Sequence, residues 1–229
     1  TATAALYRQV SVGSVRHVIN AAIAADASRV VHLSSIAAYG LDFEHLCHET
    51  DDIGVLTGHP YCDAKAASEH AALAAHAAGE MACTIVRPGD VYGPASRPWA
   101  LIPLELIKKN QLILPAQGRG VFSPVYIDNL LDGMVAAATH SQAAGQIYNI
   151  TDGVGVSCRE FFAHHWRWAG KRGSIPCLPT RLAQGLTKSG EWMFRHVLRQ
   201  PTEISSSSLA MLTRQATYSI AKAQQQLGY

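Results

Sequence analysis

The stretch Arg29-Val-Val-His-Leu-Ser34 decides the fold, because it is a short, mainly apolar run that predicts a buried strand. Apolar residues at helical spacing precede it from Ser14 to Asp26, and an alanine-rich helix is expected after it from Ala64 to Ala78. Cys83-Thr-Ile-Val-Arg-Pro88 is then a second buried strand, closed by proline. Strands that alternate with helices pair in parallel, so the sequence predicts an α/β fold with helices on both faces of a sheet.

The same alternation continues to residue 150 and then stops. The further elements expected are a helix over 101–110, a strand over 124–127, a helix over 129–139 and a strand over 145–150. From Ser157 onward the pattern predicts only helices and loops, with helices over 159–168, 181–199 and 220–227. We therefore expect a sheet domain over residues 1–150 and a smaller, mostly helical lobe over residues 151–229, to which residues 95–120 contribute.

The composition is that of a globular protein with little net charge. The 229 residues are 48% hydrophobic and 16% charged, and the formal net charge is +2. No basic run follows a helix or loop, so no nucleic-acid partner is predicted. The sequence also has no apolar stretch of about 18 residues and no basic segment ahead of a long apolar one, so neither a membrane span nor a signal peptide is predicted.

The five cysteines form no C-x-x-C pair, which argues against a disulfide framework and against a zinc site. A reducing, cytoplasmic compartment fits this cysteine usage. His45, Cys47, His48 and Glu49 crowd one segment, but their spacing matches no common zinc pattern. We therefore predict no bound metal.

Tyr61 and Lys65 are four residues apart at the start of the alanine-rich helix, so the phenol and the ammonium share one face, about one turn apart. Tyrosine, with a pKa of about 10, is too weak an acid to serve as a base near neutrality, but a neighbouring ammonium favours the phenolate. This spacing also occurs by chance on ordinary surface helices. Ser34 and Ser35 strengthen the case, because they end a buried strand at the edge of a sheet where ligands bind.

Three segments in this order resemble the extended short-chain dehydrogenase/reductases: Val31-His-Leu-Ser-Ser-Ile-Ala-Ala-Tyr-Gly40, Tyr61-Cys-Asp-Ala-Lys65 and Ile85-Val-Arg-Pro-Gly-Asp-Val-Tyr-Gly-Pro94. The resemblance covers nearly the whole chain. It implies a Rossmann-like, doubly wound parallel sheet, NAD or NADP as cofactor, and hydride transfer between the nicotinamide and an alcohol or ketone. Residues 1–150 would then be part of the dinucleotide-binding and catalytic domain, and residues 151–229 the substrate-binding lobe.

The resemblance also assigns roles to single residues. Ser35 would be the catalytic serine, Tyr61 the acid/base, and Lys65 its partner, which also binds the nicotinamide ribose. The expected cofactor-binding residues are Ser34, Tyr61, Lys65, Pro88, Gly89 and Val91. The expected substrate-binding residues are Ser35, Ala37, Tyr61 and Arg97.

The glycine-rich turn that normally admits a dinucleotide diphosphate does not occur in this sequence. Gly118-Arg-Gly120 is no substitute, because it precedes a predicted strand instead of following one. We expect the sequence to be an incomplete record of a larger enzyme, and we expect the glycine-rich N-terminal unit to be the missing part. If the chain is complete, a non-catalytic nucleotide-binding or remnant protein is the alternative.

The segments around the predicted site favour one reaction class over others. Ile36 and Ala37 stand where the family's dehydratases need an acid pair, which argues against dehydration. A sugar-nucleotide epimerase usually has an arginine near 121–128, where this sequence has none, although that activity stays as an alternative. The sequence Val125-Tyr-Ile-Asp-Asn129 and the aromatic residues of the lobe over 151–229 are most similar to the 3β-hydroxysteroid dehydrogenase branch. This similarity implies an apolar, sterol-like substrate. The residues behind this expectation, whose more common role is core packing, are Phe161, Phe162, Trp166, Trp168, Trp192, Met193 and Phe194.

The resemblance also implies a homodimer. Family members often dimerise through two helices that pack as a four-helix bundle, here over 14–26 and 64–78.

Overall fold

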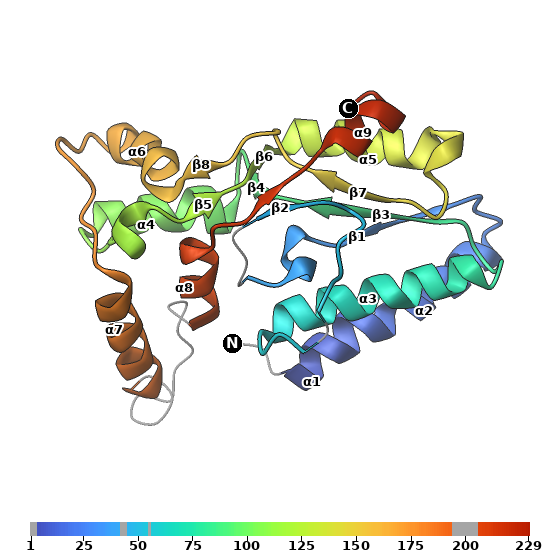
Figure 1. The fold of residues 1–229 in the computed structure, drawn as a ribbon, viewed down its shortest axis with the longest axis horizontal. Helices are drawn as coiled ribbons and strands as arrows, with labels where there is room; N and C mark the ends of the chain where they lie inside the picture. Colours follow the sequence, from blue (N-terminus) through green and yellow to red (C-terminus); the bar gives the residue numbers. More distant parts are fainter. Residues whose placement is uncertain (1–3, 42–44, 55, 194–205) are drawn as a thin grey trace.

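The computed structural model describes residues 4–41, 45–54, 56–193 and 206–229. Its centre is a parallel three-stranded sheet in the order β1-β3-β7, made of β1 (Val30–Leu33), β3 (Cys83–Pro88) and β7 (Ile147–Ile150) (Figure 1). In the register Val30 lies beside Cys83, and Ile85 lies beside Ile147. The strands predicted over 29–34, 83–88 and 145–150 are therefore confirmed, and for β3 both end residues match the prediction.

Helices cover both faces of this sheet, because successive strand residues point to opposite sides. On β1, Val30 packs in the apolar cluster with α2 and α3, whereas its neighbour Val31 packs in the cluster with α5 and α9. Figure 1 shows α2 and α3 on one side of the sheet and α5 and α9 on the other. The bounds are α2 Ser14–Ala24, α3 Pro60–Ala77, α5 Ile127–Thr139 and α9 Ala221–Leu227. The predicted Rossmann-like α/β architecture is therefore confirmed.

Smaller elements connect and flank this sheet. Three ladders of two strands pair β2 (Leu46–Cys47) with β9 (Thr217–Tyr218), β4 (Asp90–Tyr92) with β6 (Pro124–Tyr126), and β5 (Val121–Phe122) with β8 (Val156–Ser157). The short helical turns are α1 (Ala4–Tyr7), η1 (Arg8–Gly13), η2 (Ile36–Tyr39), η3 (Arg97–Leu101), η4 (Ala116–Gly118) and η5 (Ser141–Ala143). The remaining helices are α4 (Ile102–Lys108), α6 (Cys158–Trp168), α7 (Thr180–Met193) and α8 (Ser206–Thr213).

The prediction of only helices and loops after Ser157 is wrong at β9. This strand pairs in parallel with β2, so that Thr217 lies beside Leu46. A strand of two residues has no periodicity to read, and its partner is far away in the sequence. The division of the chain into two parts at residue 150 stays a prediction. Helix α9 belongs to the second part by sequence but packs on the central sheet.

The aromatic residues of the second half are mainly core. Phe161 and Phe162 of α6 are buried, and the Phe161 ring stacks on Phe122 with 3.8 Å between ring centres. Trp168, by contrast, is 70% exposed at the end of α6. The side chains of Trp192 and Met193, and all of Phe194, lie outside the described residues, as does the end of the helix expected over 181–199.

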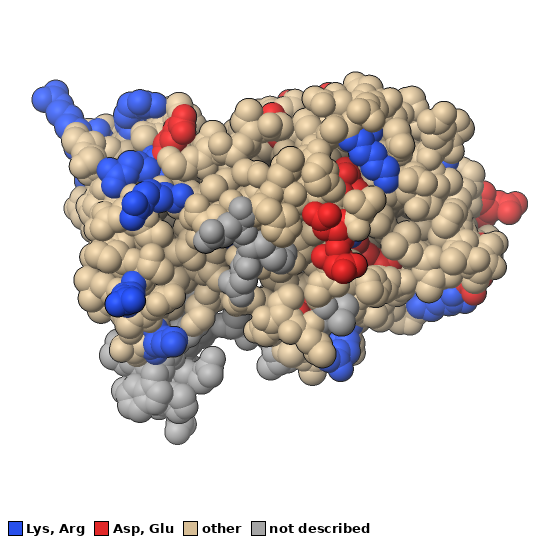
Figure 2. All heavy atoms as spheres, viewed as in Figure 1, with Lys and Arg blue, Asp and Glu red and all other residues tan. Residues whose placement is uncertain are grey.

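The surface agrees with the composition. On the face drawn in Figure 2 the basic side chains lie in separate groups, mostly over the lobe of α4, α6 and α7, and form no continuous stripe. Among the described residues, no helix has both the length and the hydropathy to cross a bilayer. A groove of about 210 Å³ follows the side of β1 away from β3, with Val18, Val31 and Leu33 in its lining.

Candidate active site

Ser35 and Tyr61 come together at the carboxyl end of the central sheet. Ser35 lies two residues beyond the end of β1 and caps η2, its hydroxyl accepting a hydrogen bond from the Ala37 N–H at 3.1 Å. Tyr61 is the second residue of α3, which begins with Pro60 at a position that suits proline. The Ser35 side chain lies close enough to the Tyr61 phenol to lower the pKa of that phenol. Two hydroxyls therefore meet at one point, where they can share a substrate oxygen.

Lys65 lies one turn further along α3 and also faces the end of β1. Its Nζ donates a hydrogen bond to the Leu33 carbonyl oxygen at 2.9 Å. An ammonium has three N–H donors, so two remain for hydroxyl groups of a ligand. Burial lowers the pKa of Lys65, and the nearby Glu69 carboxylate opposes that shift.

The pKa of Tyr61 moves in the opposite direction to the one expected from the sequence. Burial raises this pKa above its ordinary value of 10.0, and the hydrogen bond from Ser35 lowers it by a smaller amount. The expectation that Lys65 makes the phenol more acidic is wrong for this structure, where desolvation is the largest cause and Lys65 is not among the causes. Tyr61 is therefore a protonated phenol at neutral pH.

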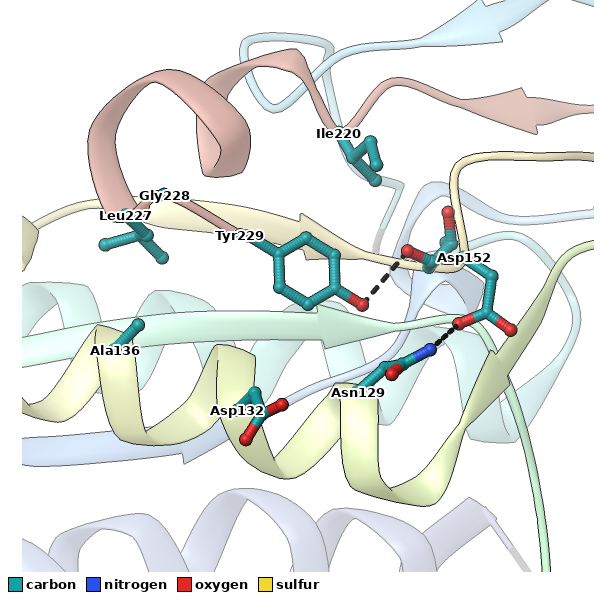
Figure 3. Close-up of a pocket in the computed structure, with 9 residues that line it drawn as sticks. Asn129, Asp132, Ala136, Asp152, Ile220, Leu227, Gly228 and Tyr229 are labelled. Atoms are coloured by element: carbon teal, nitrogen blue, oxygen red, sulfur yellow. Dashed lines mark hydrogen bonds between the residues drawn. The ribbon is translucent and has the colours of Figure 1, made fainter.

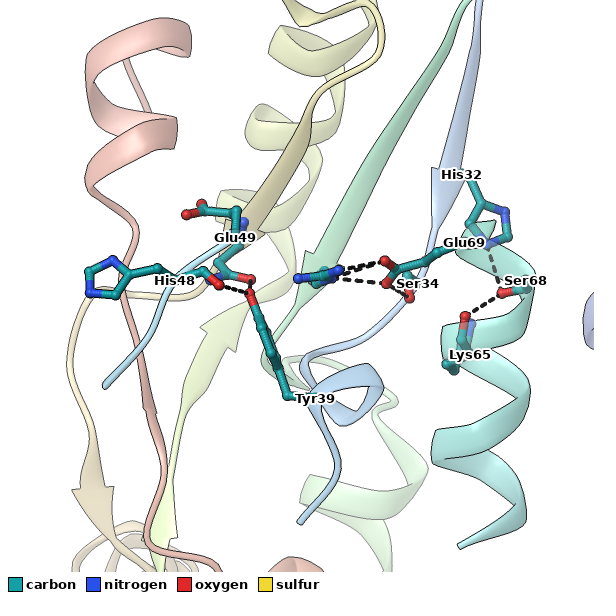
Figure 4. A network of polar contacts seen from close by, with 10 residues as sticks. His32, Ser34, Tyr39, His48, Glu49, Lys65, Ser68 and Glu69 are labelled. Atoms are coloured by element: carbon teal, nitrogen blue, oxygen red, sulfur yellow. Dashed lines mark hydrogen bonds and ion pairs between the residues drawn. The ribbon is translucent and has the colours of Figure 1, made fainter. Parts of the chain in front are cut away.

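Ser34 differs from its neighbour Ser35, because its side chain is buried within the protein. The Ser34 hydroxyl donates to Glu69 at 2.5 Å, and the Glu69 carboxylate is also held by two nitrogens of Arg87, the closer at 2.7 Å (Figure 4). The Ser34 hydroxyl is thus occupied by Glu69, and the cofactor-binding role of Ser34 stays a prediction.

The same network continues across the sheet. The Arg87 guanidinium lies 4.5 Å from the centre of the Tyr39 ring, and the Tyr39 hydroxyl donates to the Asn149 side-chain oxygen at 2.9 Å. Burial disfavours the charged form of Arg87, but its bonds with Glu69 outweigh this and raise its pKa. Sequence reasoning missed Glu69 and Arg87 as partners, although Glu69 follows Lys65 by one further turn of the same helix.

The turn from Pro88 to Val91 is packed so closely that it requires glycine. The Gly89 N–H donates to the Ile150 carbonyl at 2.9 Å, and a Cβ at Gly89 would lie 2.3 Å from the Ser123 carbonyl oxygen. The next residue, Asp90, is buried and paired with Arg214. Pro88 ends β3 and Val91 lies in β4, so the turn connects the central sheet with the β4–β6 ladder.

The remaining predicted substrate residues fall in different surroundings. Ala37 is 1% exposed and packs with Leu41, Cys62 and Tyr61 in an apolar cluster at the two hydroxyls. Arg97 is an exposed residue at the start of η3 and does not belong to that cluster. The structure thus brings Ala37 to the site, and Arg97 stays a prediction.

A group of potential metal ligands exists in the loop before α3. Within the described residues, ligand atoms of His45, Cys47 and Asp51 lie within 4.8 Å of one another. Burial raises the pKa of the Cys47 thiol to about 11. The expectation of no bound metal stays a prediction.

A separate pocket of about 400 Å³ lies between α5 and α9, and neither the two hydroxyls nor Lys65 lines it (Figure 3). Its Asp152 carboxylate accepts hydrogen bonds from the Asn129 side chain and from the Tyr126 N–H. Asp152 therefore caps the start of α5 from the end of β7. Sequence reasoning missed this carboxylate.

The residues at the carboxyl edge of the sheet fit one end of a nicotinamide dinucleotide. Lys65 has spare donors for ribose hydroxyls, and the Tyr61 and Ser35 hydroxyls lie beside it. Gly89, directly after the neighbouring strand β3, has no side chain, and its backbone packs closely on Ser123. The donor set is therefore that of a nicotinamide riboside site.

Comparison with known proteins agrees with this fold and donor set. Over its whole length, the chain is 26% identical to 4-hydroxy-2-methyl-3-oxo-4-farnesyl-3,4-dihydroquinoline-1-oxide ketoreductase of Stigmatella aurantiaca, of which it covers 68%. Over 69% of the chain, it is 28% identical to dTDP-glucose 4,6-dehydratase of Streptomyces griseus, of which it covers 48%. The chain thus spans about half to two thirds of the length of these relatives.

Solved structures show the same fold at low sequence identity. The structure of gox2253 matches all of this chain and 69% of its own, with a TM-score of 0.77 and 20% identity. MoeE5 in complex with UDP-glucose and NAD matches 96% of this chain and 64% of its own, with a TM-score of 0.71 and 21% identity. The model of the NAD dependent epimerase/dehydratase family matches residues 2–151, which include every residue of the candidate site. The chain therefore belongs to the NAD dependent epimerase/dehydratase family.

Proposed function

We propose that this chain is the catalytic part of an NAD(P)-dependent oxidoreductase that interconverts an apolar ketone and the corresponding secondary alcohol. The observation that carries the proposal is the contact between the Ser35 and Tyr61 hydroxyls, with Lys65 one helical turn away. Two hydroxyls at one point can bind a carbonyl oxygen and deliver a proton to it. Lys65 adds the donors that a ribose needs.

In the proposed reaction each residue has one task. Ser35 donates a hydrogen bond to the carbonyl oxygen and fixes the position of the carbon, which lowers the entropy cost of the reaction. The bound nicotinamide cofactor supplies the hydride. Tyr61 gives its phenolic proton to the oxygen as the negative charge on that oxygen grows. Lys65 holds the ribose hydroxyls while it keeps its bond to the Leu33 carbonyl.

The raised pKa of Tyr61 keeps the phenol in the form that can act as the acid in ketone reduction. Because burial keeps the phenol protonated near neutrality, Tyr61 is ready to act as an acid toward a ketone. In the opposite direction the same phenol must first lose its proton. The ketoreductase from Stigmatella aurantiaca supports this direction by its name.

An apolar substrate is supported by the immediate surroundings of the hydroxyls. Ala37, Leu41 and Cys62 form the apolar cluster that contacts Tyr61. Ile36, which stands where dehydratases have an acid, is 2% exposed and belongs to a neighbouring apolar cluster. The name of the Stigmatella aurantiaca relative includes a farnesyl group, which is also apolar. We therefore propose a hydrophobic ketone, of which a sterol is one example.

Sugar-nucleotide epimerisation is the second candidate, because a UDP-glucose 4-epimerase of Vibrio cholerae is 28% identical over 68% of this chain. The two functions differ in the charge that the substrate site must accept. Incubation with UDP-glucose and NAD, followed by separation of the hexose products, distinguishes them. Formation of UDP-galactose would replace the ketoreductase proposal with the epimerase.

We also propose a cytoplasmic location and a homodimer. All five cysteines are free thiols, which supports a reducing compartment. Val18 and Ile23 of α2 are 53% and 44% exposed, and these side chains suit a helix-to-helix contact with a second copy. Sedimentation of the protein, with Val18→Glu as the disrupting variant, tests the dimer. A monomer at micromolar concentration would refute it.

The oxidoreductase proposal is tested with Ser35→Ala in the protein expressed from its complete reading frame. We expect reduction of methyl decyl ketone by NADPH or NADH, with a loss of roughly a hundredfold in kcat/KM for the variant, because one aligned hydrogen bond to the oxygen is removed. Ser157→Ala is the control, because the Ser157 hydroxyl caps α6 by accepting a hydrogen bond from the Glu160 N–H and belongs to no predicted site. Equal losses for the two variants would contradict the role of Ser35.

A further inference from the structure

Helix α8 reaches the candidate site from a distant part of the sequence. Its Ala210 and Met211 pack against the apolar cluster of Ala37, Leu41 and Cys62, which also contains Tyr61. In Figure 1 α8 lies between α7 and the elements of the central sheet. Ala210 and Met211 are only partly buried, so part of each apolar side chain stays accessible next to the cluster against which Tyr61 also packs.

The last turn of α8 is fixed to the chain near β5 by close backbone contact. A Cβ at Gly120 would lie 2.0 Å from the Leu212 carbonyl oxygen, so only glycine lets the two backbones approach. The Val121 N–H donates to the Arg214 carbonyl at 2.8 Å, and Arg214 Nε donates back to the Val121 carbonyl at 3.1 Å. The position of α8 is therefore set where the helix ends.

A buried ion pair completes this attachment. The Arg214 guanidinium bonds to Asp90, and the two side chains are 2% and 5% exposed. Asp90 also accepts the Ser123 N–H at 2.9 Å and directly follows Gly89 in the turn next to the site. An ion pair excluded from water tolerates little displacement, because either charge left alone is costly. The pair thus connects α8 with the turn after β3.

The pair also decides which charges are available to a substrate. Arg214 is held by Asp90 and by the Val121 carbonyl, so its charge is neutralised inside the protein. The part of α8 that packs on the same cluster as Tyr61 contributes a methyl and a thioether side chain. Such a surface suits a hydrocarbon and not a diphosphate, whose charge needs available cations.

We propose that Ala210 and Met211 form the wall of the substrate pocket that selects hydrocarbon groups next to the reacting carbonyl, and that the Arg214–Asp90 pair positions this wall. The inference rests on the proposed oxidoreductase function and names the residues that determine its specificity. Met211 contacts substrate directly, and Arg214 acts through the placement of α8.

The first test compares Met211→Ala with Met134→Ala in the protein expressed from its complete reading frame. The readout is the ratio of kcat/KM for methyl decyl ketone to that for butanone. Met211→Ala lowers this ratio by about tenfold, the size expected when a pocket loses contact with one or two methylene groups. Met134 packs on the opposite face of the sheet, against the cluster with α5 and α9, so its variant leaves the ratio unchanged. An unchanged ratio for Met211→Ala, or equal changes for both, overturns the proposal.

The second test concerns positioning. Arg214→Met removes the charge at similar length, and we expect it to raise KM for methyl decyl ketone much more than it lowers kcat. Arg214→Lys restores part of the loss, since a cation still faces Asp90. Gly120→Ala moves the end of α8 without a change in charge and should reproduce the KM effect, which keeps the test valid if Arg214→Met does not fold. A uniform fall in kcat with no change in KM for the folded variants overturns the positioning role.

A binding measurement separates this inference from the proposed function. The neutral fluorophore N-phenyl-naphthylamine is titrated into wild type, Met211→Ala and Met134→Ala, with methyl decyl ketone as competitor. If wild type reduces no ketone but Met211→Ala alone weakens fluorophore binding several-fold, the oxidoreductase proposal fails and the apolar wall stands. If all three bind the fluorophore equally, the wall proposal is wrong whether or not the protein reduces ketones.

Discussion

Replacement of Arg87 by methionine tests the buried polar network beneath the site. Glu69 is fully buried and Arg87 is 1% exposed, and the pair is joined by bonds of 2.7–3.1 Å. In Arg87→Met the Glu69 carboxylate would keep only the Ser34 hydroxyl as a donor. The methionine also gives up the contact of the guanidinium with the Tyr39 ring at 4.5 Å.

The expected magnitude follows from this burial. Removal of one partner from a buried ion pair lowers the free energy of unfolding by about 3–5 kcal/mol, because the remaining charge stays buried without water or a partner. The free energy of unfolding of a domain is only about 5–15 kcal/mol, so this single change removes a large part of it. The double variant Glu69→Leu, Arg87→Met should recover most of the loss, since no charge is then left without a partner.

Urea unfolding followed by circular dichroism measures these differences. The matched control is Arg16→Met, which breaks the exposed pair Arg16–Glu80, where the side chains are 57% and 37% exposed. We expect the control to lose less than about 1 kcal/mol. Equal losses for the buried and the exposed arginine, or a double variant less stable than Arg87→Met, would refute the reasoning.

Two further predictions concern Tyr61 and the turn at Gly89. Burial raises the pKa of Tyr61 above 10.0, so the phenol is protonated at every pH below that raised pKa. The value of kcat/KM for ketone reduction should therefore be constant across neutral pH and fall only as the pH rises through the raised pKa of Tyr61. A pH profile in which kcat/KM already declines near neutrality would contradict this. Gly89→Ala places a methyl group 2.3 Å from the Ser123 carbonyl oxygen and should cost about 1–3 kcal/mol in thermal unfolding while raising KM for the cofactor. Gly185→Ala, where a Cβ meets nothing within 4 Å, is the control and should be neutral or slightly stabilising, and equal effects of the two would disprove the close packing at Gly89.

The local parts of the fold could be predicted from the sequence. β3 begins at Cys83 and ends at Pro88 as expected, because a buried apolar run closed by proline leaves little choice. Tyr61 and Lys65 share a helix face through their spacing alone, and Ser35 lies near them because parallel strands end at one edge of the sheet.

Contacts between distant segments could not be predicted. β2 and β9 are strands of two residues, and no periodic pattern specifies their pairing. Arg87 and Glu69 are polar residues in a strand and a helix, and only the packing of α3 on β3 turns them into a buried pair. The sign of the pKa shift at Tyr61 depends on burial, which a four-residue spacing does not reveal.

The most direct measurement on the central claim is the turnover of Tyr61→Phe. This variant keeps the ring and the fold but removes the proton that the claim gives to the carbonyl oxygen. We expect kcat for ketone reduction to fall by about a thousandfold, within the range that general acid catalysis supplies. Tyr7→Phe, whose ring packs edge-on against Tyr61 with 6.0 Å between ring centres, should keep kcat within about twofold, since its hydroxyl has no role in the proposed proton transfer. Turnover by Tyr61→Phe at the wild-type rate would contradict the account.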